Sequence, residues 1–129
     1  MLRSCRRAVL VALVLETGCL SPTLPLPPPE APLTITESVP PGEDGESTWL
    51  VRGTCSPGAI VLVENVDTGR IQGIEDDDGD GRYTLSVAAK PCARAEVWQL
   101  FEDIQSTRTG FLVAPTTNGS VAPGACVTP

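Results

Sequence analysis

The residue types best suited to chemistry gather in one acidic run, EDDDGDG, at residues 75–81. Within it, Asp76, Asp78 and Asp80 occupy alternate positions, and Gly81 follows the third aspartate. Carboxylate oxygens at alternate positions are how a calcium-binding loop begins to wrap a hard cation. The spacing therefore makes Asp76, Asp78 and Asp80 candidate Ca²⁺ ligands.

A second interpretation of the run stays open, because aspartate and glycine are also what a tight turn needs. A helix-flanked calcium loop has glutamate at its twelfth position, where this chain has Val87. The segment after the run alternates like a strand and not like a helix. A complete motif of that kind is excluded, which leaves either a solvated acidic hairpin or a looser Ca²⁺ site.

The composition argues against catalysis and against nucleic acid. The chain has no histidine, the commonest general base and metal ligand. Consecutive acids on one hairpin do not form the pair across a cleft that glycoside hydrolysis needs. The formal net charge of −7 repels phosphate backbones. We expect no enzyme, no cofactor apart from the candidate Ca²⁺, and no nucleic-acid partner.

The first residues predict an export signal. Residues 1–7 are basic, and residues 8–15 form an apolar run that is too short to cross a bilayer. Gly18-Cys19 follows and resembles the cleavage box of bacterial lipoproteins, although Glu16 stands where that family has an apolar residue. The resemblance implies a signal peptide at 1–18 and a lipidated Cys19. An uncleaved signal with an ordinary Cys19 thiol is the alternative.

The residues around the export signal also bear on location and on the linker. Leu20 stands where an aspartate often marks retention in the inner membrane, so the resemblance implies an outer-membrane lipoprotein of the cell envelope, anchored by its lipid. Arg6-Arg7 leaves twin-arginine export as an alternative route. Eight of the thirteen prolines lie between Leu20 and Pro41. Because proline-rich chain favours an extended backbone, we expect residues 19–32 to be a tether.

Residues 33–114 predict an all-β domain. Tyr83, Leu85 and Val87 alternate with polar residues, which indicates a strand with one buried face. Pro57-Gly58 suits a type II turn, and no stretch has a convincing helical period. The sequence thus predicts a single small β-sandwich, with a flexible tail at 115–129. About seven strands are expected, at residues 34–36, 47–54, 59–65, 70–74, 82–88, 94–101 and 109–113.

The turn pattern carries a resemblance to a known family. The matching residues are Gly53, Pro57-Gly58-Ala59, Val61, Val63, Gly69, the run from Asp78 to Tyr83, and Leu85. Together they resemble a bacterial immunoglobulin-like domain, with the carboxypeptidase regulatory-like domain as a second choice. The resemblance implies an immunoglobulin-like sandwich at 33–114. It indicates little about function, because such sandwiches serve many functions.

The cysteines predict one disulfide and one unpaired thiol. Cys55, Cys92 and Cys126 remain once the signal peptide is gone and Cys19 is lipidated, in a compartment that permits disulfides. Cys55–Cys92 is the favoured pair because both residues lie inside the predicted domain. The immunoglobulin-like strand order argues the other way, because it puts these two residues at opposite ends. Cys92–Cys126 is therefore the alternative pair.

The expected function is binding or structural. The first reading is a lipoprotein that presents one immunoglobulin-like domain to a protein or glycan partner. A Ca²⁺-stabilised surface module and an accessory subunit of a larger envelope complex are the alternatives. Both tryptophans are expected to be mainly core residues, and Trp98 is the better candidate for a contact surface.

Overall fold

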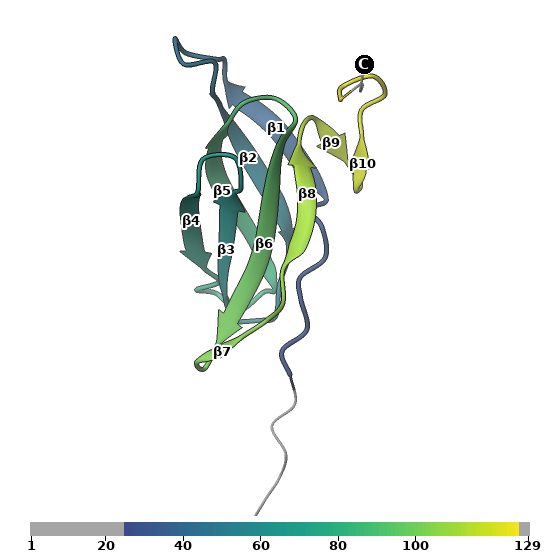
Figure 1. The fold of residues 1–129 in the computed structure, drawn as a ribbon. Coiled ribbons are helices and arrows are strands. Elements are labelled where there is room, and N and C mark those ends of the chain that lie inside the picture. Colours follow the sequence, from purple (N-terminus) through teal and green to yellow (C-terminus); the bar gives the residue numbers. More distant parts are fainter. Residues whose placement is uncertain (1–24, 127–129) are drawn as a thin grey trace, which may run out of the picture.

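The structure is a computed structural model that describes residues 25–126. The expected signal peptide and the expected lipidation of Cys19 lie outside the described residues. Within the described residues there are strands and turns but no helix, as the sequence predicts. Ten strands form two antiparallel sheets that face one another (Figure 1). The bounds are β1 (Thr34–Val39), β2 (Ser47–Thr54), β3 (Ile60–Asn65), β4 (Arg70–Glu75), β5 (Arg82–Ala89), β6 (Ala93–Phe101), β7 (Ile104–Gln105), β8 (Thr109–Val113), β9 (Thr116–Thr117) and β10 (Ser120–Val121).

Each sheet collects strands from both halves of the chain. The first sheet has the order β10-β9-β1-β2-β5, and the second has the order β4-β3-β6. Beyond β6, β8 pairs with its first half and β7 with its last two residues. Among residues 25–126, strand β4 pairs only with β3 and β5 only with β2, so both are edge strands of the described sandwich. They lie on the same side of the sandwich.

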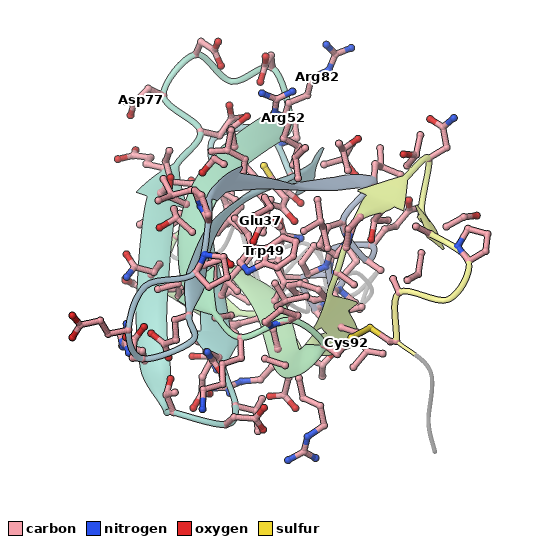
Figure 2. All side chains as sticks on the ribbon, turned by 90° about the horizontal axis from the view of Figure 1, so that it is seen from above. Glu37, Trp49, Arg52, Asp77, Arg82 and Cys92 are labelled. Atoms are coloured by element: carbon pink, nitrogen blue, oxygen red, sulfur yellow. A yellow bond between two sulfur atoms is a disulfide. The ribbon has the colours of Figure 1, made fainter. Side chains whose placement is uncertain are left out.

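The core forms between the two sheets because most strands alternate. On β2 and β5 the residues that face inward are buried and their neighbours are mostly exposed, which is the pattern of a sheet with one wet face. Trp49 lies between the sheets (Figure 2), where its Nε1 donates to the carbonyl oxygen of Ala89 at 3.0 Å. The other buried core residues are Ile35, Val51, Val61, Val63, Tyr83, Leu85, Val87, Ala89, Ala93, Ala95, Val97 and Val113.

The C-terminal segment differs from the expected flexible tail. Residues 116–121 form the β9–β10 hairpin, which pairs with β1 through Ile35 and Thr116. Asn118 and Gly119 make its turn with φ of 51° and 81°. Asparagine followed by glycine tolerates this left-handed backbone, which two-residue hairpins require. The segment is therefore part of the sandwich as far as Cys126.

A disulfide joins Cys92 and Cys126, and Cys55 is a free thiol. The favoured pair Cys55–Cys92 is therefore wrong, and the alternative pair forms. The reason is the strand order. Cys55 follows the end of β2 that is next to Arg82, whereas Cys92 follows Ala89 at the other end of β5. The two residues thus lie at opposite ends of the sandwich.

Part of the predicted tether packs on the domain. Pro29 and Pro32 are buried. The side chain of Gln99 donates to the carbonyl oxygen of Pro27 at 2.7 Å, and Thr109 Oγ1 donates to that of Pro29 at 2.6 Å. Residues 27–32 are called the strap below. The last six residues of the expected 19–32 tether are thus bound to the sandwich.

The strand registers define two ends of the molecule. One end carries Thr54, Ile60, Glu75 and Arg82 with the turns that connect them, together with β7. It is called the acidic end, because the acidic run lies there. The other end carries Ser47, Asn65 and the turn that holds Cys92, and is called the disulfide end. Figure 1 shows the strap at the acidic end and the last described residues at the disulfide end.

Candidate functional site: the acidic loop

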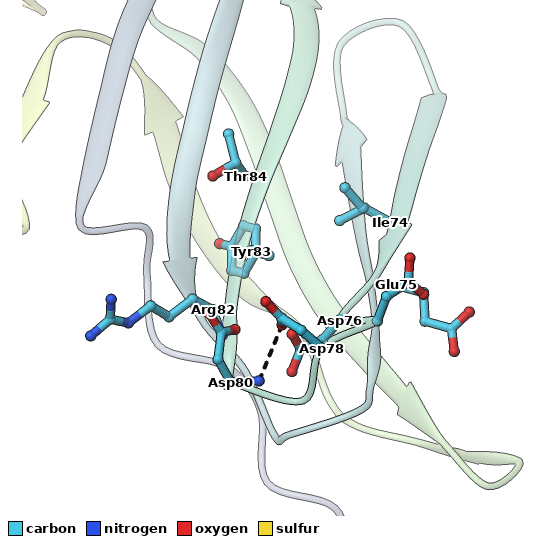
Figure 3. Close-up of a pocket in the computed structure, with 9 residues that line it drawn as sticks. Ile74, Glu75, Asp76, Asp78, Asp80, Arg82, Tyr83 and Thr84 are labelled. Carbon is cyan, nitrogen blue, oxygen red and sulfur yellow. Dashed lines mark hydrogen bonds between the residues drawn. The ribbon is translucent and has the colours of Figure 1, made fainter.

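The acidic loop, residues 76–81, connects the two edge strands β4 and β5 (Figure 3). It brings the three predicted ligands together: one carboxylate oxygen from each of Asp76, Asp78 and Asp80 lies within 4.8 Å of the others. Asp78 and Asp80 are exposed, whereas Asp76 is only 5 % exposed. The sequence prediction therefore identified the residues that gather here.

Asp76 has a structural role that the sequence pattern did not indicate. Its Oδ2 accepts from the backbone N–H of Gly58 at 3.0 Å and from that of Gly81 at 2.9 Å. These bonds join the β2–β3 turn to the acidic loop. They hold the pKa of Asp76 below its usual value, the Gly58 bond most strongly, and outweigh the opposing effect of burial. Asp76 is thus an ionised side chain that fixes the loop.

Asp78 and Asp80 shape the rest of the loop. Asp78 Oδ1 accepts from the N–H of Asp80 at 3.3 Å, and Asp80 Oδ1 accepts from the N–H of Arg82 at 2.9 Å. The N–H of Asp80 lowers the pKa of Asp78, but the hydrogen bond to Asp76, burial and the charge of Asp80 together raise it. The net shift is upward, mainly because the hydrogen bond to Asp76 favours the protonated carboxyl of Asp78.

The loop borders an open depression of about 450 Å³ that Ile74, Tyr83 and Thr84 also line. Figure 3 shows the Arg82 side chain pointing away from the three aspartates. Its guanidinium therefore does not neutralise the cluster through a direct contact. Chemically, this arrangement suits a hard cation with oxygen ligands and lacks a nucleophile paired with a base.

The free thiol of Cys55 lies near the same loop and is half-buried. Burial, followed by the charges of Asp76 and Asp80, raises the pKa of Cys55 to about 11. A thiol with such a pKa stays protonated at neutral pH and is a poor nucleophile. The unpaired cysteine that the sequence predicts is therefore an unreactive one.

Trp98 is buried, in line with the expectation that both tryptophans are mainly core residues, and it does not form an exposed contact surface. It lies on the outer face of β6, yet it is only 4 % exposed. The guanidinium of Arg108 covers it, 3.7 Å from the ring centroid. Arg108 is held there by Glu64 at 2.6 Å and by Glu96 at 3.1 Å. A cation stacked on the ring thus replaces solvent on this tryptophan.

Sequence reasoning also missed Gln99 as a residue of interest. Its side chain donates to the strap, and its Oε1 accepts from the N–H of Ser56 at 2.8 Å. The signal was present, because Gln99 continues the inward alternation of Ala95 and Val97 on β6. A polar residue at an inward position must find hydrogen-bond partners.

No helix in residues 25–126 is long and apolar enough to cross a membrane. A scan against protein-family models and searches of curated proteins and of solved structures found no match to this chain.

Proposed function

We propose that the protein is an envelope lipoprotein, anchored at Cys19, that presents one immunoglobulin-like β-sandwich as a non-catalytic binding or structural module. The observation that carries the proposal is the Cys92–Cys126 disulfide in the domain that follows the export signal. Disulfides persist in oxidising compartments outside the cytoplasm, where a lipoprotein signal would deliver the chain. The outer membrane is the proposed location.

The strand order supports the immunoglobulin-like part of the proposal. Strands β1, β2 and β5 are neighbours in one sheet, and β3, β6 and β8 are neighbours in the other. Immunoglobulin-like sandwiches divide their first, second and fifth strands from their third, sixth and seventh in this way. Here β4 extends the sheet of β3. The β9–β10 hairpin extends the other sheet beside β1.

The proposed partner is a protein or a glycan, and β4 is the surface most open to it. All six residues of β4 are exposed, and Ile71 and Ile74 are 49 % and 38 % exposed. As an edge strand, β4 leaves backbone N–H and C=O groups unpaired along one side. Such an edge can accept an added strand from a protein partner.

The test is the intact mass of the protein purified from its native membrane. We expect a chain that begins at Cys19 and carries acyl groups. Alkylation before and after reduction should report one free thiol and one disulfide. The Cys19→Ser variant is the control and should retain its signal peptide. A mass that begins at Met1, or a chain without lipid, would contradict the proposed anchor.

A second candidate function, a Ca²⁺-stabilised surface module, is favoured by the grouping of the aspartate oxygens within 4.8 Å. A bound cation would relieve the repulsion that raises the pKa of Asp78. We expect millimolar Ca²⁺ to raise the melting temperature of the wild-type domain and not that of an Asp78→Asn, Asp80→Asn variant. Mg²⁺ is the control for charge screening. An equal rise in both proteins, or none, rules out this candidate.

A further inference from the structure

Gln99 binds the strap from inside the sandwich. Its side chain is almost fully buried, at 2 % exposure of the residue. Its Nε2 donates to Pro27 and its Oε1 accepts from Ser56, so both ends of the amide are used. Its backbone N–H donates to Ser106 Oγ at 3.0 Å, which fixes the strand at this point. Gln99 therefore has little freedom to release the strap without leaving a buried polar group unpaired.

Thr109 makes a second contact with the strap, at Pro29, five residues before β1 begins at Thr34. Its hydroxyl donates to the carbonyl oxygen of Pro29, a residue that is itself buried. Proline has no backbone N–H, so this part of the strap can only accept hydrogen bonds and cannot pair as an ordinary strand. The donors must come from domain side chains, and Gln99 and Thr109 are the two that supply them within residues 25–126.

After the strap, the chain enters the first sheet directly, with no unbonded residues between Pro32 and β1. Pro32 is buried, and the N–H of Leu33 donates to the carbonyl oxygen of Arg52 at 2.9 Å, directly before β1 begins. Followed in the other direction, the strap leaves the sandwich at the acidic end, opposite Cys126 (Figure 1). The point at which the linker leaves the domain is thus fixed by specific contacts.

We infer that the strap sets the distance and the orientation of the domain on the membrane, with the acidic end toward the lipid surface. This inference rests on the proposed lipidation of Cys19. Seven residues, Leu20–Leu26, lie between that cysteine and the strap. Fully extended, they span at most about 25 Å, whereas a linker that included the strap would span roughly 45 Å. The disulfide end therefore faces away from the bilayer.

The orientation is tested by energy transfer from a dye on the lipidated full-length chain to acceptor-labelled headgroups in vesicles of phosphatidylethanolamine and phosphatidylglycerol. In a Cys55→Ser background, the dye is placed at Asp103→Cys on the acidic end or at Thr68→Cys on the disulfide end. We expect markedly stronger transfer from position 103. Equal transfer from both positions, or stronger transfer from position 68, would overturn the inferred orientation.

The strap itself is tested by releasing it. We expect Thr109→Val and Gln99→Ala to reduce the difference in transfer between the two positions. Thr84→Val and Gln72→Ala, which alter exposed strand residues, are the matched controls and should leave it unchanged. Thr109→Val removes a single hydroxyl, so it preserves a folded test if Gln99→Ala does not fold. An unchanged difference in a folded release variant overturns the role of the strap.

A second measurement separates the strap from the lipid anchor. A dye at Ala31→Cys, an exposed strap position, reports local motion through its fluorescence anisotropy in the Cys55→Ser chain with or without lipid. We expect the anisotropy to fall in Thr109→Val and to stay unchanged in Thr84→Val. If the anisotropy falls but the protein fails to bind vesicles, the strap is supported and only the proposed lipid anchor is contradicted. No fall contradicts the strap even where the anchor is correct.

Discussion

The two ends of the sandwich are closed by different chemistry. At the disulfide end a covalent bond joins the β5–β6 turn to the C-terminal segment. At the acidic end, hydrogen bonds of Asp76 and Gln99 join the β2–β3 turn to the acidic loop and to the strap. The first depends on the redox state, whereas the Asp76 bonds of the second depend on the protonation of that carboxyl. The closure of each end of the sandwich is therefore sensitive to a different solution condition.

The largest effect should follow from opening the disulfide end. Cys92→Ser removes a bond between residues separated by 34 positions, which the chain-entropy model values at about 3–4 kcal/mol. Urea unfolding measures the change. Cys55→Ser is the matched control and should change stability little. Equal stability of wild type and Cys92→Ser under oxidising conditions would show that the disulfide does not secure this end.

The acidic end should respond to Asp76→Ala. The substitution leaves the N–H groups of Gly58 and Gly81 without their acceptor, and we expect the melting temperature to fall by about 5–10 °C. Asp76→Asn keeps an oxygen acceptor and should lose less. Differential scanning calorimetry measures both. A melting temperature unchanged in Asp76→Ala would contradict the role of this side chain.

Acid should lower the stability that the acidic end contributes to the domain, and a reductant should not have this effect. The pKa of Asp76 is lowered in the folded state, so its stabilisation is present above the unfolded value of about 4. That stabilisation is lost as the pH falls through the lower folded value. Thermal unfolding between pH 7 and pH 2 should therefore show a decline below about pH 4 that is smaller in Asp76→Asn.

A smaller effect of opposite sign is expected at Tyr83, near the start of β5. Its hydroxyl is buried and has no hydrogen-bond partner among residues 25–126, and burial raises its pKa. Tyr83→Phe removes that group and should stabilise the domain by about 1 kcal/mol. Tyr83→Leu is the control, since its lost volume should destabilise. A loss of stability in Tyr83→Phe, measured by urea unfolding, would indicate that the hydroxyl is satisfied in solution.

The smallest effect is expected at Asp78. Its pKa is raised, so its charge opposes folding at neutral pH and stops doing so as the pH falls through the raised value. Asp78→Asn should raise the melting temperature by about 1–2 °C at pH 7. The gain should vanish below about pH 4, where the carboxyl is neutral in both states. A gain that persists there would have another origin.

The strands could be predicted because their information is local. Alternation on β5 and the apolar run on β3 fix which residues face inward, and each predicted segment forms a strand with bounds close to those expected. The strap could not be predicted, because its contacts join Pro27 and Pro29 to residues 72 and 80 positions away. A proline-rich sequence looks the same whether it is bound or free.

The C-terminal hairpin is an intermediate case. Asn118-Gly119 is the strongest short signal for a two-residue hairpin turn, so β9 and β10 were predictable in principle. The surrounding segment is rich in glycine, proline, serine and threonine, a composition that is typical of a loose tail, so the turn signal was not recognised. Of the candidate site, the three aspartates were found by spacing alone, whereas the hydrogen bonds of Asp76 to Gly58 depend on how two loops meet in the fold.

The pairing of the first strand of the domain with its C-terminal hairpin has a consequence for when the first sheet can be completed. The N–H of Gly119 donates to the carbonyl oxygen of Leu33 at 2.9 Å, and β9 pairs with β1, so the earliest and the latest parts of the domain complete the same sheet. Pairings of such high sequence separation form slowly and only after the last residues have been synthesised. The first sheet is therefore closed late in folding, and the Cys92–Cys126 disulfide then links the segment that closes it to the β5–β6 turn.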